Sequence, residues 1–216
     1  SIIIVSLNRK EDLLNCLQSL YSQTYKRYEI LLIDNGSIDG SAKAVIEKFP
    51  ITRVYQTNVN LGTSYTRNAG VKFSKGELIW FLDSDVYLEN SDTLKNLVQH
   101  IVGYQKIDGI GGEAVINNSG EIIGTKMLKL YPNGLTKGYL NINHSKEKFS
   151  TKVIATCNLL IKKEVFKNIG GFDHFYFFYL EDIDLTFRIS QKGYDLFLLN
   201  KCPVVHHFSE FSRFGN

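Results

Sequence analysis

The chain has 216 residues, 44% of them hydrophobic and 22% charged, with a formal net charge of +3 at pH 7. This composition is that of a globular domain, so it excludes an intrinsically disordered chain, and the charge is too small to predict nucleic-acid binding. Cys16, Cys157 and Cys202 are far apart and lack CxxC spacing, which argues against a disulfide framework or zinc site and favours reduced thiols.

Strands and helices are predicted to alternate through the first half of the chain. Apolar runs predict buried strands at 1–7, 28–34 and 76–83, and the segment 52–57 is expected to be a further strand between the last two. Helical periodicity between these runs predicts helices at 13–21, 42–49 and 63–73. The alternation indicates an α/β fold with a doubly wound, mostly parallel sheet, in which ligands bind at the carboxyl ends of the strands.

The second half is less regular. Its expected elements are a helix near 91–104, strands near 109–116 and 121–126, a strand and helix within 153–172, a helix ending at Gly193, and short strands at 194–199 and 203–207. Residues 126–152 are rich in lysine and have no clear period, so we interpret them as a long loop or flap. We find no internal repeat and no domain boundary, which predicts a single domain over 1–216.

Polar residues follow three of the predicted strands. Asp83 and Asp85 come after the fourth strand, Asp34 ends the second, and Ser6 to Asn8 end the first. Carboxylates are ligands that Mg²⁺ and Mn²⁺ take together with substrate phosphates, so the paired aspartates predict a metal site for a phosphorylated ligand. A polar turn is the alternative for the pair, and an N-cap or turn role is the alternative for Asp34.

The segment 58–70 adds Asn60 and Arg67 around a loop and a helix. An arginine here can bind a phosphate or a nucleobase carbonyl, or it can be a helix-surface residue paired with an acid. The residues alone leave these two interpretations level. Asp184 and Arg188 are four residues apart and are expected to form an ordinary ion pair within a helix.

Glu181 and Asp182 stand near the start of a predicted helix, where the helix dipole by itself favours acids. Five aromatic residues at 175–179 precede them, and a carboxylate beside apolar surface tends to have a raised pKa, which suits a general base. His206 and His207 near the end of the chain are surface or packing residues, or supply an imidazole to a metal. Side chains alternate along a strand, so only one of the two can face a site.

Six segments, taken in order, resemble family 2 glycosyltransferases, which are inverting enzymes with the GT-A fold. The resemblance covers about 1–209 and weakens over 115–150. Of the six segments given next, the fifth is most similar to the rhamnosyltransferase-like branch of the family. The segments are SIIIVSLNRKEDLLNCLQSL, YEILLIDNGSIDGS, NLGTSYTRNAG, GELIWFLDSDV, IGGFDHFYFFYLEDIDLTFRISQKGY and VVHH. The family implies a Rossmann-like central sheet flanked by helices, with a nucleotide-binding half at 1–115 and an acceptor-binding half at 116–216 that carries a smaller mixed sheet.

The resemblance implies a nucleotide-diphosphate sugar as donor, of UDP or dTDP type, with Mn²⁺ or Mg²⁺ on its diphosphate. It assigns Asp34 to the base, Arg67 to the nucleotide and Asp83 to the ribose. The full set of residues expected at the nucleotide sugar is Ser6, Asn8, Asp34, Asn60, Arg67 and Asp83.

The resemblance also implies a metal site and a catalytic base. Asp85 and His206, with His207 as the alternative histidine, are the expected metal ligands. Asp182 matches the general base, and Glu181 is its acceptor-side neighbour.

The chain departs from the family pattern at three places. Ser6-Leu7-Asn8-Arg9 replaces a stretch that often carries an aromatic residue, so stacking on the base is not supported there. His174 stands where a glutamate is common, and Thr156 where a glycine is usual. These changes fall near the donor and acceptor pockets, so we expect them to affect which sugar is used.

We therefore expect an inverting transfer of a sugar to a hydroxyl of a glycan or lipid-linked acceptor, in polysaccharide biosynthesis for the cell envelope. No apolar run reaches the roughly eighteen residues of a membrane span. We expect a cytoplasmic protein at the inner face of the membrane, peripherally associated and without a nucleic-acid partner. Two alternatives are weaker: a sugar nucleotidyltransferase, because VSLNRKED lacks glycine, and a non-catalytic nucleotide-sugar-binding domain, because the acids are present.

Overall fold

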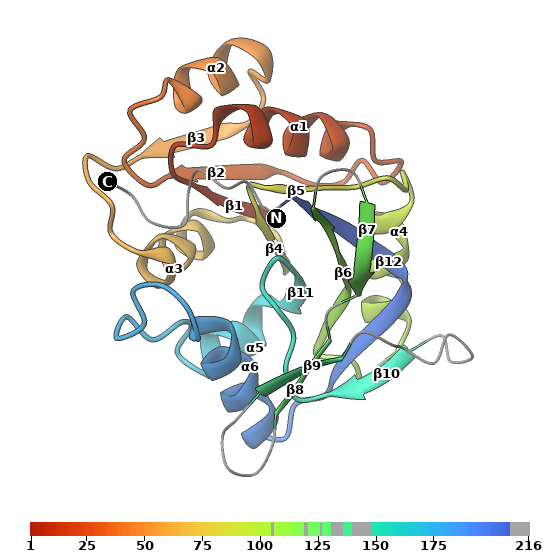
Figure 1. Ribbon diagram of the computed structural model, residues 1–216. Helices are drawn as coiled ribbons and strands as arrows, with labels where there is room; N and C mark the ends of the chain where they lie inside the picture. The colour runs from red at the N-terminus through yellow and green to blue at the C-terminus, as the bar shows by residue number, and fades with distance from the viewer. Residues whose placement is uncertain (105, 119–120, 126, 131–135, 140–147, 208–216) are drawn as a thin grey trace.

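The computed structural model describes residues 1–207 except 105, 119–120, 126, 131–135 and 140–147. The first half alternates strands and helices as expected, because its apolar runs are buried in a sheet and its periodic segments cover that sheet (Figure 1). Its elements are β1 (Ile2–Ser6), α1 (Lys10–Tyr21), β2 (Ile30–Asp34), α2 (Ser41–Lys48), β3 (Arg53–Gln56), α3 (Thr63–Phe73), β4 (Leu78–Asp83), β5 (Val86–Tyr87) and α4 (Thr93–Gly103).

The second half is richer in strands than in helices. It contains β6 (Gly109–Asn118), β7 (Glu121–Thr125), β8 (Met127–Leu130), β9 (Thr136–Tyr139), β10 (Lys148–Thr151), β11 (Asn158–Lys162), α5 (Lys163–Asn168), α6 (Glu181–Gln191) and β12 (Leu196–His207).

The main sheet has ten strands, eight of them in the order β10-β12-β6-β11-β4-β1-β2-β3, with β5 paired to β12 and β7 to β6. Strands β4, β1, β2 and β3 run parallel, whereas β11 joins β4 and β6 in antiparallel orientation. A small second sheet pairs β8 with β9 in antiparallel orientation. The α/β class with a Rossmann-like central sheet and a smaller second sheet is therefore confirmed, and the mixed pairing lies in the main sheet.

Two buried layers lie on the two faces of this sheet. Alternation along β1 sends Ile2 and Ile4 into one layer, where α1 and α4 pack, and Ile3 into the other, where α3, α5 and α6 pack. Figure 1 shows α1 and α3 on opposite sides of β1. A strand buried on both faces must be apolar at every position, which explains the continuous run at the start of the chain.

Two expectations for the second half are wrong. The lysine-rich stretch at 126–152 is not one long loop, because β8, β9 and β10 lie within it; apart from Lys152, the rest of that stretch falls outside the described residues. Each of these strands has only four residues, too few to give a readable period. The two short strands near the end are one strand, β12, with a register shift between Leu199 and Val204.

The division at residue 115 stays a prediction. Strand β6 crosses that position, and the main sheet continues through it.

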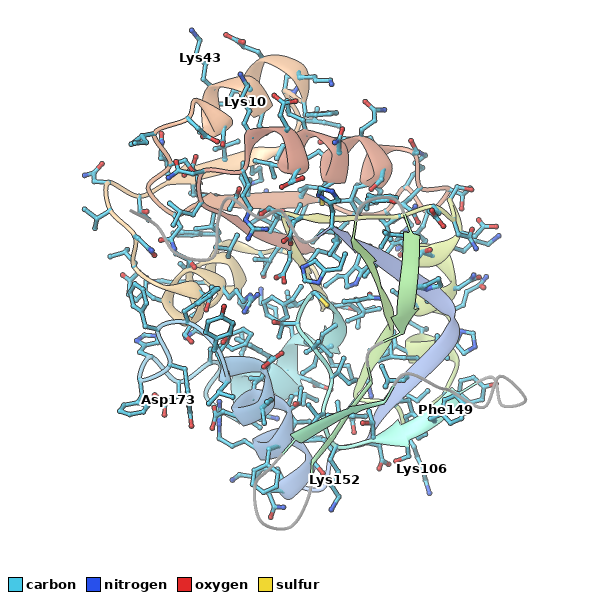
Figure 2. All side chains as sticks on the ribbon, in the orientation of Figure 1. Lys10, Lys43, Lys106, Phe149, Lys152 and Asp173 are labelled. Carbon is cyan, nitrogen blue, oxygen red and sulfur yellow. The ribbon has the colours of Figure 1, made fainter. Side chains whose placement is uncertain are left out.

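In the part of the chain that the structure describes, no helix combines the length and the apolar character needed to cross a membrane. Lys43, Lys106 and Lys152 are exposed and lie at the periphery, on different parts of the fold (Figure 2).

Candidate active site

The carboxyl ends of β1, β2 and β4 lie level with one another. Ser6 of β1 pairs in register with Asp34 of β2, and Val5 pairs with Asp83 of β4. Parallel strands end at the same edge of a sheet, so the polar residues that follow them gather there. The sequence-based expectation that these three strand ends converge is therefore confirmed as geometry.

Asp34 and Ser6 place unpaired polar atoms in a buried position. Asp34 is fully buried, and its Oδ1 accepts a hydrogen bond of 2.7 Å from the backbone N–H of Ser37. Its Oδ2 and the hydroxyl of Ser6 are also buried, and neither has a hydrogen-bond partner among the described residues. Buried polar atoms are rarely left without partners, so this pair is suited to hydrogen bonding with a ligand.

Asn8 and Asn60 are exposed and hold the loops around this edge. Asn8 has φ 52, its backbone N–H donates to Ser37 Oγ, and its side-chain oxygen accepts from the backbone N–H of Ile38 at 2.8 Å. The oxygen of Asn60 accepts from Asn35 Nδ2 at 2.7 Å. Both asparagines therefore fix the loop geometry, and their direct contact with a ligand stays a prediction.

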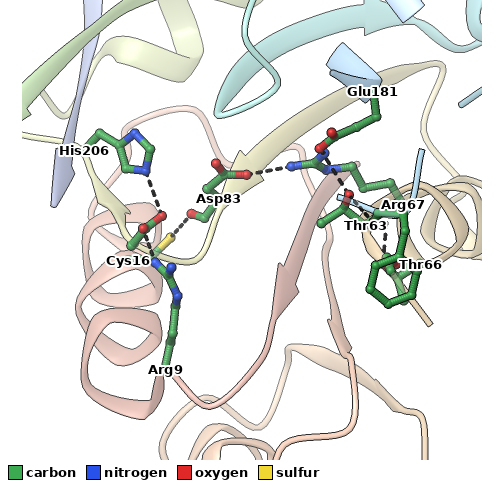
Figure 3. Close-up of polar contacts among 11 residues, drawn as sticks. Arg9, Cys16, Thr63, Thr66, Arg67, Asp83, Glu181 and His206 are labelled. Carbon is green, nitrogen blue, oxygen red and sulfur yellow. Dashed lines mark hydrogen bonds and ion pairs between the residues drawn. The ribbon is translucent and has the colours of Figure 1, made fainter. Parts of the chain in front are cut away.

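Asp85 is the centre of a charged cluster. One of its oxygens contacts a guanidinium nitrogen of Arg9, and the other lies 3.1 Å from Nε2 of His206 (Figure 3). Burial alone would raise the pKa of Asp85, but hydrogen bonding to His206 and the charges of His206 and Arg9 lower it. Burial would lower the pKa of His206, but Asp85 raises it. Asp85 is therefore held as a carboxylate.

Asp83, Asp85 and His206 form a ligand set of the kind that Mn²⁺ and Mg²⁺ use. Their candidate ligand atoms all lie within 4.8 Å of one another. Two carboxylates and one imidazole suit a borderline-to-hard divalent cation, and a partly exposed Asp83 leaves the cluster open to a phosphate. The residues present thus fit the predicted metal.

The two terminal histidines point to different partners. His206 reaches Asp85, whereas Nδ1 of His207 lies 3.3 Å from Asp12 of α1. Alternation along β12 separates them, as expected. Of the two candidates, the geometry places His206 in the ligand set.

Arg67 connects the strand ends to the start of α6. It is buried in α3, its Nη1 donates to Glu181 at 2.7 Å, and its Nη2 donates to Asp83 at 2.8 Å (Figure 3). Burial alone would lower the pKa of Arg67, but these two acids raise it. The alternative of a helix-surface arginine is wrong, because the side chain is enclosed between two carboxylates. Its contact with a nucleotide stays a prediction.

Glu181 and Asp182 have different environments although they are adjacent. Glu181 is buried and accepts hydrogen bonds from Arg67 and from Thr63 at 3.1 Å, while its second oxygen is buried without a partner among the described residues. Asp182 is partly buried, and that burial, with the negative charge of Glu181, raises its pKa to about 6. The raised pKa expected from the sequence is confirmed for Asp182.

The aromatic segment 175–180 docks through its backbone. The carbonyl of Phe177 accepts from the backbone N–H of Thr63 at 2.9 Å, and the carbonyl of Tyr176 accepts from Ser64 at the start of α3. The side chains of Phe175, Phe177 and Phe178 are therefore left exposed. We expected apolar surface from these rings to raise the pKa of the acids, but the raised pKa of Asp182 comes from its burial and from the negative charge of Glu181.

The backbone just before α6 is strained. Tyr179 and Leu180 have φ 69 and φ 66, a left-handed conformation that side-chain-bearing residues adopt at a cost.

The ion pair expected within α6 is confirmed, with Arg188 Nη2 at 2.6 Å from Asp184.

Arg9 is the residue of this site that sequence reasoning did not select. It appeared only within the altered Ser6-Leu7-Asn8-Arg9 stretch, yet it contacts Asp85 from a position 76 residues away in the chain. His174, a second departure, contacts Asn68 and the ring of Tyr65 instead of the acids. A charged residue between a strand end and a helix start was the available signal for Arg9.

Comparison with known proteins gives the family. The model of glycosyl transferase family 2 matches residues 1–170, and a model described as the N-terminal domain of galactosyltransferase matches residues 136–212. The glycosyltransferase AglE of Haloferax volcanii is 28% identical over 207 residues, which are 91% of this chain and 62% of AglE. The chain thus spans less than two thirds of that relative.

Two further proteins are similar over nearly the whole chain. The N-acetylglucosaminyl-diphospho-decaprenol L-rhamnosyltransferase of Mycobacterium tuberculosis is 24% identical, over 95% of this chain and 75% of its own length. The crystal structure of GalNAc-T7 with UDP, GalNAc and Mn²⁺ superposes with a TM-score of 0.81 at 20% identity, over 96% of this chain and 43% of that one. The match of the family model to most of the chain and this likeness of fold lead to one conclusion: the chain belongs to glycosyltransferase family 2 and has the GT-A fold.

Proposed function

We propose that this domain is an inverting glycosyltransferase that moves a sugar from a UDP- or dTDP-type donor to a hydroxyl of a glycan or lipid-linked acceptor. The observation that carries the proposal is the joining of two groups by Arg67. One is the Asp83-Asp85-His206 ligand set, and the other is the Glu181-Asp182 pair, whose Asp182 has a pKa of about 6. A leaving-group site and a base thus lie on the two sides of one arginine.

The donor nucleotide is bound at the ends of β1 and β2. The unpaired oxygen of Asp34 accepts an N–H of the base, and the hydroxyl of Ser6 hydrogen-bonds beside it, which gives both buried atoms the partners they lack. Asp83 binds the ribose, and its bond to Arg67 keeps the carboxylate oriented. The crystallised GalNAc-T7 complex with UDP supports a nucleotide diphosphate as the ligand.

A metal would be held by Asp85 and His206, at the edge where Asp83 also lies. When bound, a divalent cation neutralises the charge that develops on the leaving diphosphate. Manganese in the GalNAc-T7 crystal structure supports this assignment, and the choice between Mn²⁺ and Mg²⁺ is part of the test below.

Asp182 acts as the general base. Its carboxylate accepts the proton of the acceptor hydroxyl, the hydroxyl oxygen attacks the anomeric carbon from the face opposite the diphosphate, and the bond to the diphosphate breaks. One displacement inverts the configuration at that carbon. A pKa near 6 keeps Asp182 ionised at neutral pH while making it a stronger base than an ordinary aspartate. Glu181 positions this segment through Arg67.

The acceptor approaches from the side of α6. The exposed rings at 175–179 lie directly before Asp182 in the chain and offer apolar surface for a sugar or lipid. The diphospho-decaprenol acceptor in the rhamnosyltransferase's name supports a lipid-linked saccharide. We propose action at the cytoplasmic face of a membrane, where such an acceptor is anchored.

The test compares Asp182→Asn with Asp184→Asn. Both variants remove a carboxylate from the first turn of α6, but only Asp182 faces the proposed chemistry. Purified proteins are incubated with Mn²⁺ or Mg²⁺, a panel of UDP- and dTDP-sugars, and a polyprenyl-diphosphate-linked N-acetylglucosamine. We expect Asp182→Asn to lose at least about a thousandfold in turnover with donor affinity nearly unchanged, and Asp184→Asn to stay active.

Each other result contradicts a stated part of the proposal. Lost donor affinity or unchanged turnover in Asp182→Asn excludes that residue as the base. Formation of a nucleoside triphosphate and a sugar 1-phosphate from the nucleotide sugar, only when pyrophosphate is added, identifies a sugar nucleotidyltransferase. Donor binding without any product identifies a non-catalytic binding domain.

A further inference from the structure

Arg9 occupies one of the two carboxylate oxygens of Asp85, the proposed metal ligand. Asp85 has two carboxylate oxygens; Arg9 contacts one, and His206 lies 3.1 Å from the other. The side chains of Arg9 and Asp85 are only 16% and 7% exposed, so water does not weaken this ion pair as it does on an open surface. A cation supplied by the chain itself thus neutralises the proposed metal ligand.

The position of Arg9 allows it to leave Asp85 without disturbing the sheet. It precedes the first residue of α1, and its backbone carbonyl accepts from the N–H of Leu13, so its main chain is fixed at the helix start. Its long side chain reaches from there to the strand ends. A guanidinium has five N–H donors and pairs with phosphate oxygens as readily as with a carboxylate.

We propose that Arg9 is an internal counter-ion for Asp85 that passes to the donor's diphosphate when metal and donor bind. A metal ion that binds without the donor must displace the guanidinium from Asp85, and this cost weakens the binding of the metal. A nucleotide diphosphate supplies a new anionic partner for the displaced Arg9, which removes that penalty. Metal and donor therefore bind cooperatively, and the degree of cooperativity depends on Arg9. This inference rests on the proposed donor chemistry.

The first experiment measures manganese binding alone, from the electron paramagnetic resonance signal of free Mn²⁺. We expect Arg9→Met to bind Mn²⁺ about tenfold more tightly than the unmutated protein, because an uncharged side chain of similar length no longer competes for Asp85. Lys10→Met is the matched control: it removes the adjacent positive charge, on the residue that begins α1, and should change the affinity less than about twofold. Arg9→Lys keeps the charge and should bind Mn²⁺ like the unmutated protein.

If circular dichroism shows that Arg9→Met is unfolded, Arg9→Gln is used in its place. A manganese affinity in the uncharged variants that equals or falls below that of the unmutated protein overturns the proposal. So does an equal gain in Lys10→Met, because the effect would then come from net charge and not from the contact with Asp85.

The second experiment repeats the titration with UDP, dTDP and GDP. In the unmutated protein the nucleotide should raise manganese affinity by about tenfold or more, and in Arg9→Met this enhancement should be several-fold smaller. Equal enhancement in both overturns the transfer of Arg9 to the diphosphate. If none of the three nucleotides binds the unmutated protein, the proposed donor class fails, while the titration with Mn²⁺ alone still decides whether Arg9 competes for Asp85.

Discussion

Asp182 is costly to the fold because it is partly buried beside a second acid. Its folded pKa of about 6 lies above the ordinary value of 3.8, so the folded protein binds the Asp182 proton more tightly than the unfolded chain does. Stability is therefore lost as pH rises from about 4 to about 6, and the full cost remains at neutral pH. The conformational strain at Tyr179 and Leu180 adds to the free-energy cost of holding Asp182 in this position.

Asp182→Asn should consequently stabilise the domain at neutral pH. Without added metal, we expect a gain of about 2 kcal/mol in the free energy of unfolding at pH 7.5. The gain becomes small near pH 4, where Asp182 of the folded unmutated protein is protonated and therefore neutral, like the asparagine. Urea unfolding at the two pH values measures it. Asp184→Asn, which weakens the ion pair with Arg188, should give no such gain. A gain of the same size at both pH values would contradict the linkage.

Individual residues of the site were predictable where the chain itself places them at strand ends. Asp34, Asp83 and Asp85 follow apolar runs, and parallel strands bring such ends together whatever lies between them. The pairings of Arg9 and Arg67 were not predictable in this way. They join residues 76 and 114 positions apart, and the direction of a long side chain depends on packing that no local pattern encodes.

Among the elements, α3 and the aromatic segment before α6 depend on each other most closely. Gly62 precedes α3 with φ 81 and ψ 163, a conformation that essentially only glycine adopts. A Cβ there would lie 2.7 Å from the carbonyl oxygen of Phe177 and from its ring. The close approach lets Thr63 hold Phe177, and through it the start of α6.

Gly62→Ala should therefore displace the aromatic segment. We expect the substitution to destabilise the fold by about 3 kcal/mol. It should lower the rate of sugar transfer more than the affinity for the donor, because the segment before Asp182 moves while the strand ends do not. Gly40→Ala is the control for a positive φ in open space, since Gly40 has φ 81 and ψ 13, in the ordinary left-handed region, and nothing lies within 4 Å of the added carbon. Urea unfolding and donor titration of both variants measure the difference. Equal effects in the two variants would contradict a role for the close approach of Gly62 to Phe177.

The elements themselves were predictable to different degrees. Strands β1, β2 and β4 could be read because they are buried on both faces, and α1 because its buried leucines recur at helical spacing. Strands β8, β9 and β10 were missed because four residues show no usable alternation. The continuity of β12 was missed because its register shift interrupts the pattern between Leu199 and Val204.

Across the whole molecule, Arg67 joins the strand ends proposed to bind the nucleotide to the segment proposed to carry the general base. It contacts Asp83 at the end of β4 and Glu181 at the start of α6, and the Glu181 side chain is only 8% exposed. Breaking a buried ion pair by removing one partner leaves an uncompensated charge, which costs more than the pair itself contributes.

Arg67→Met should destabilise the domain by about 3 kcal/mol, and adding Glu181→Gln should recover part of that loss because the orphaned charge is removed. Arg53→Met is the control, since Arg53 pairs with a more exposed Glu29 and should cost about 1 kcal/mol or less. Chemical unfolding of the four proteins gives these values. A double variant no more stable than Arg67→Met would contradict the assigned pairing.

The unpaired oxygens of Asp34 and Ser6 have a consequence for laboratory evolution of this enzyme. Each is buried without a partner among the described residues, so each is a standing penalty in the ligand-free protein. A screen for heat resistance that ignores catalysis would reward apolar replacements at these two positions first. The proposed donor pocket would then be lost through the same substitutions that made the protein more stable, so a thermostability screen must include nucleotide binding as a second selection.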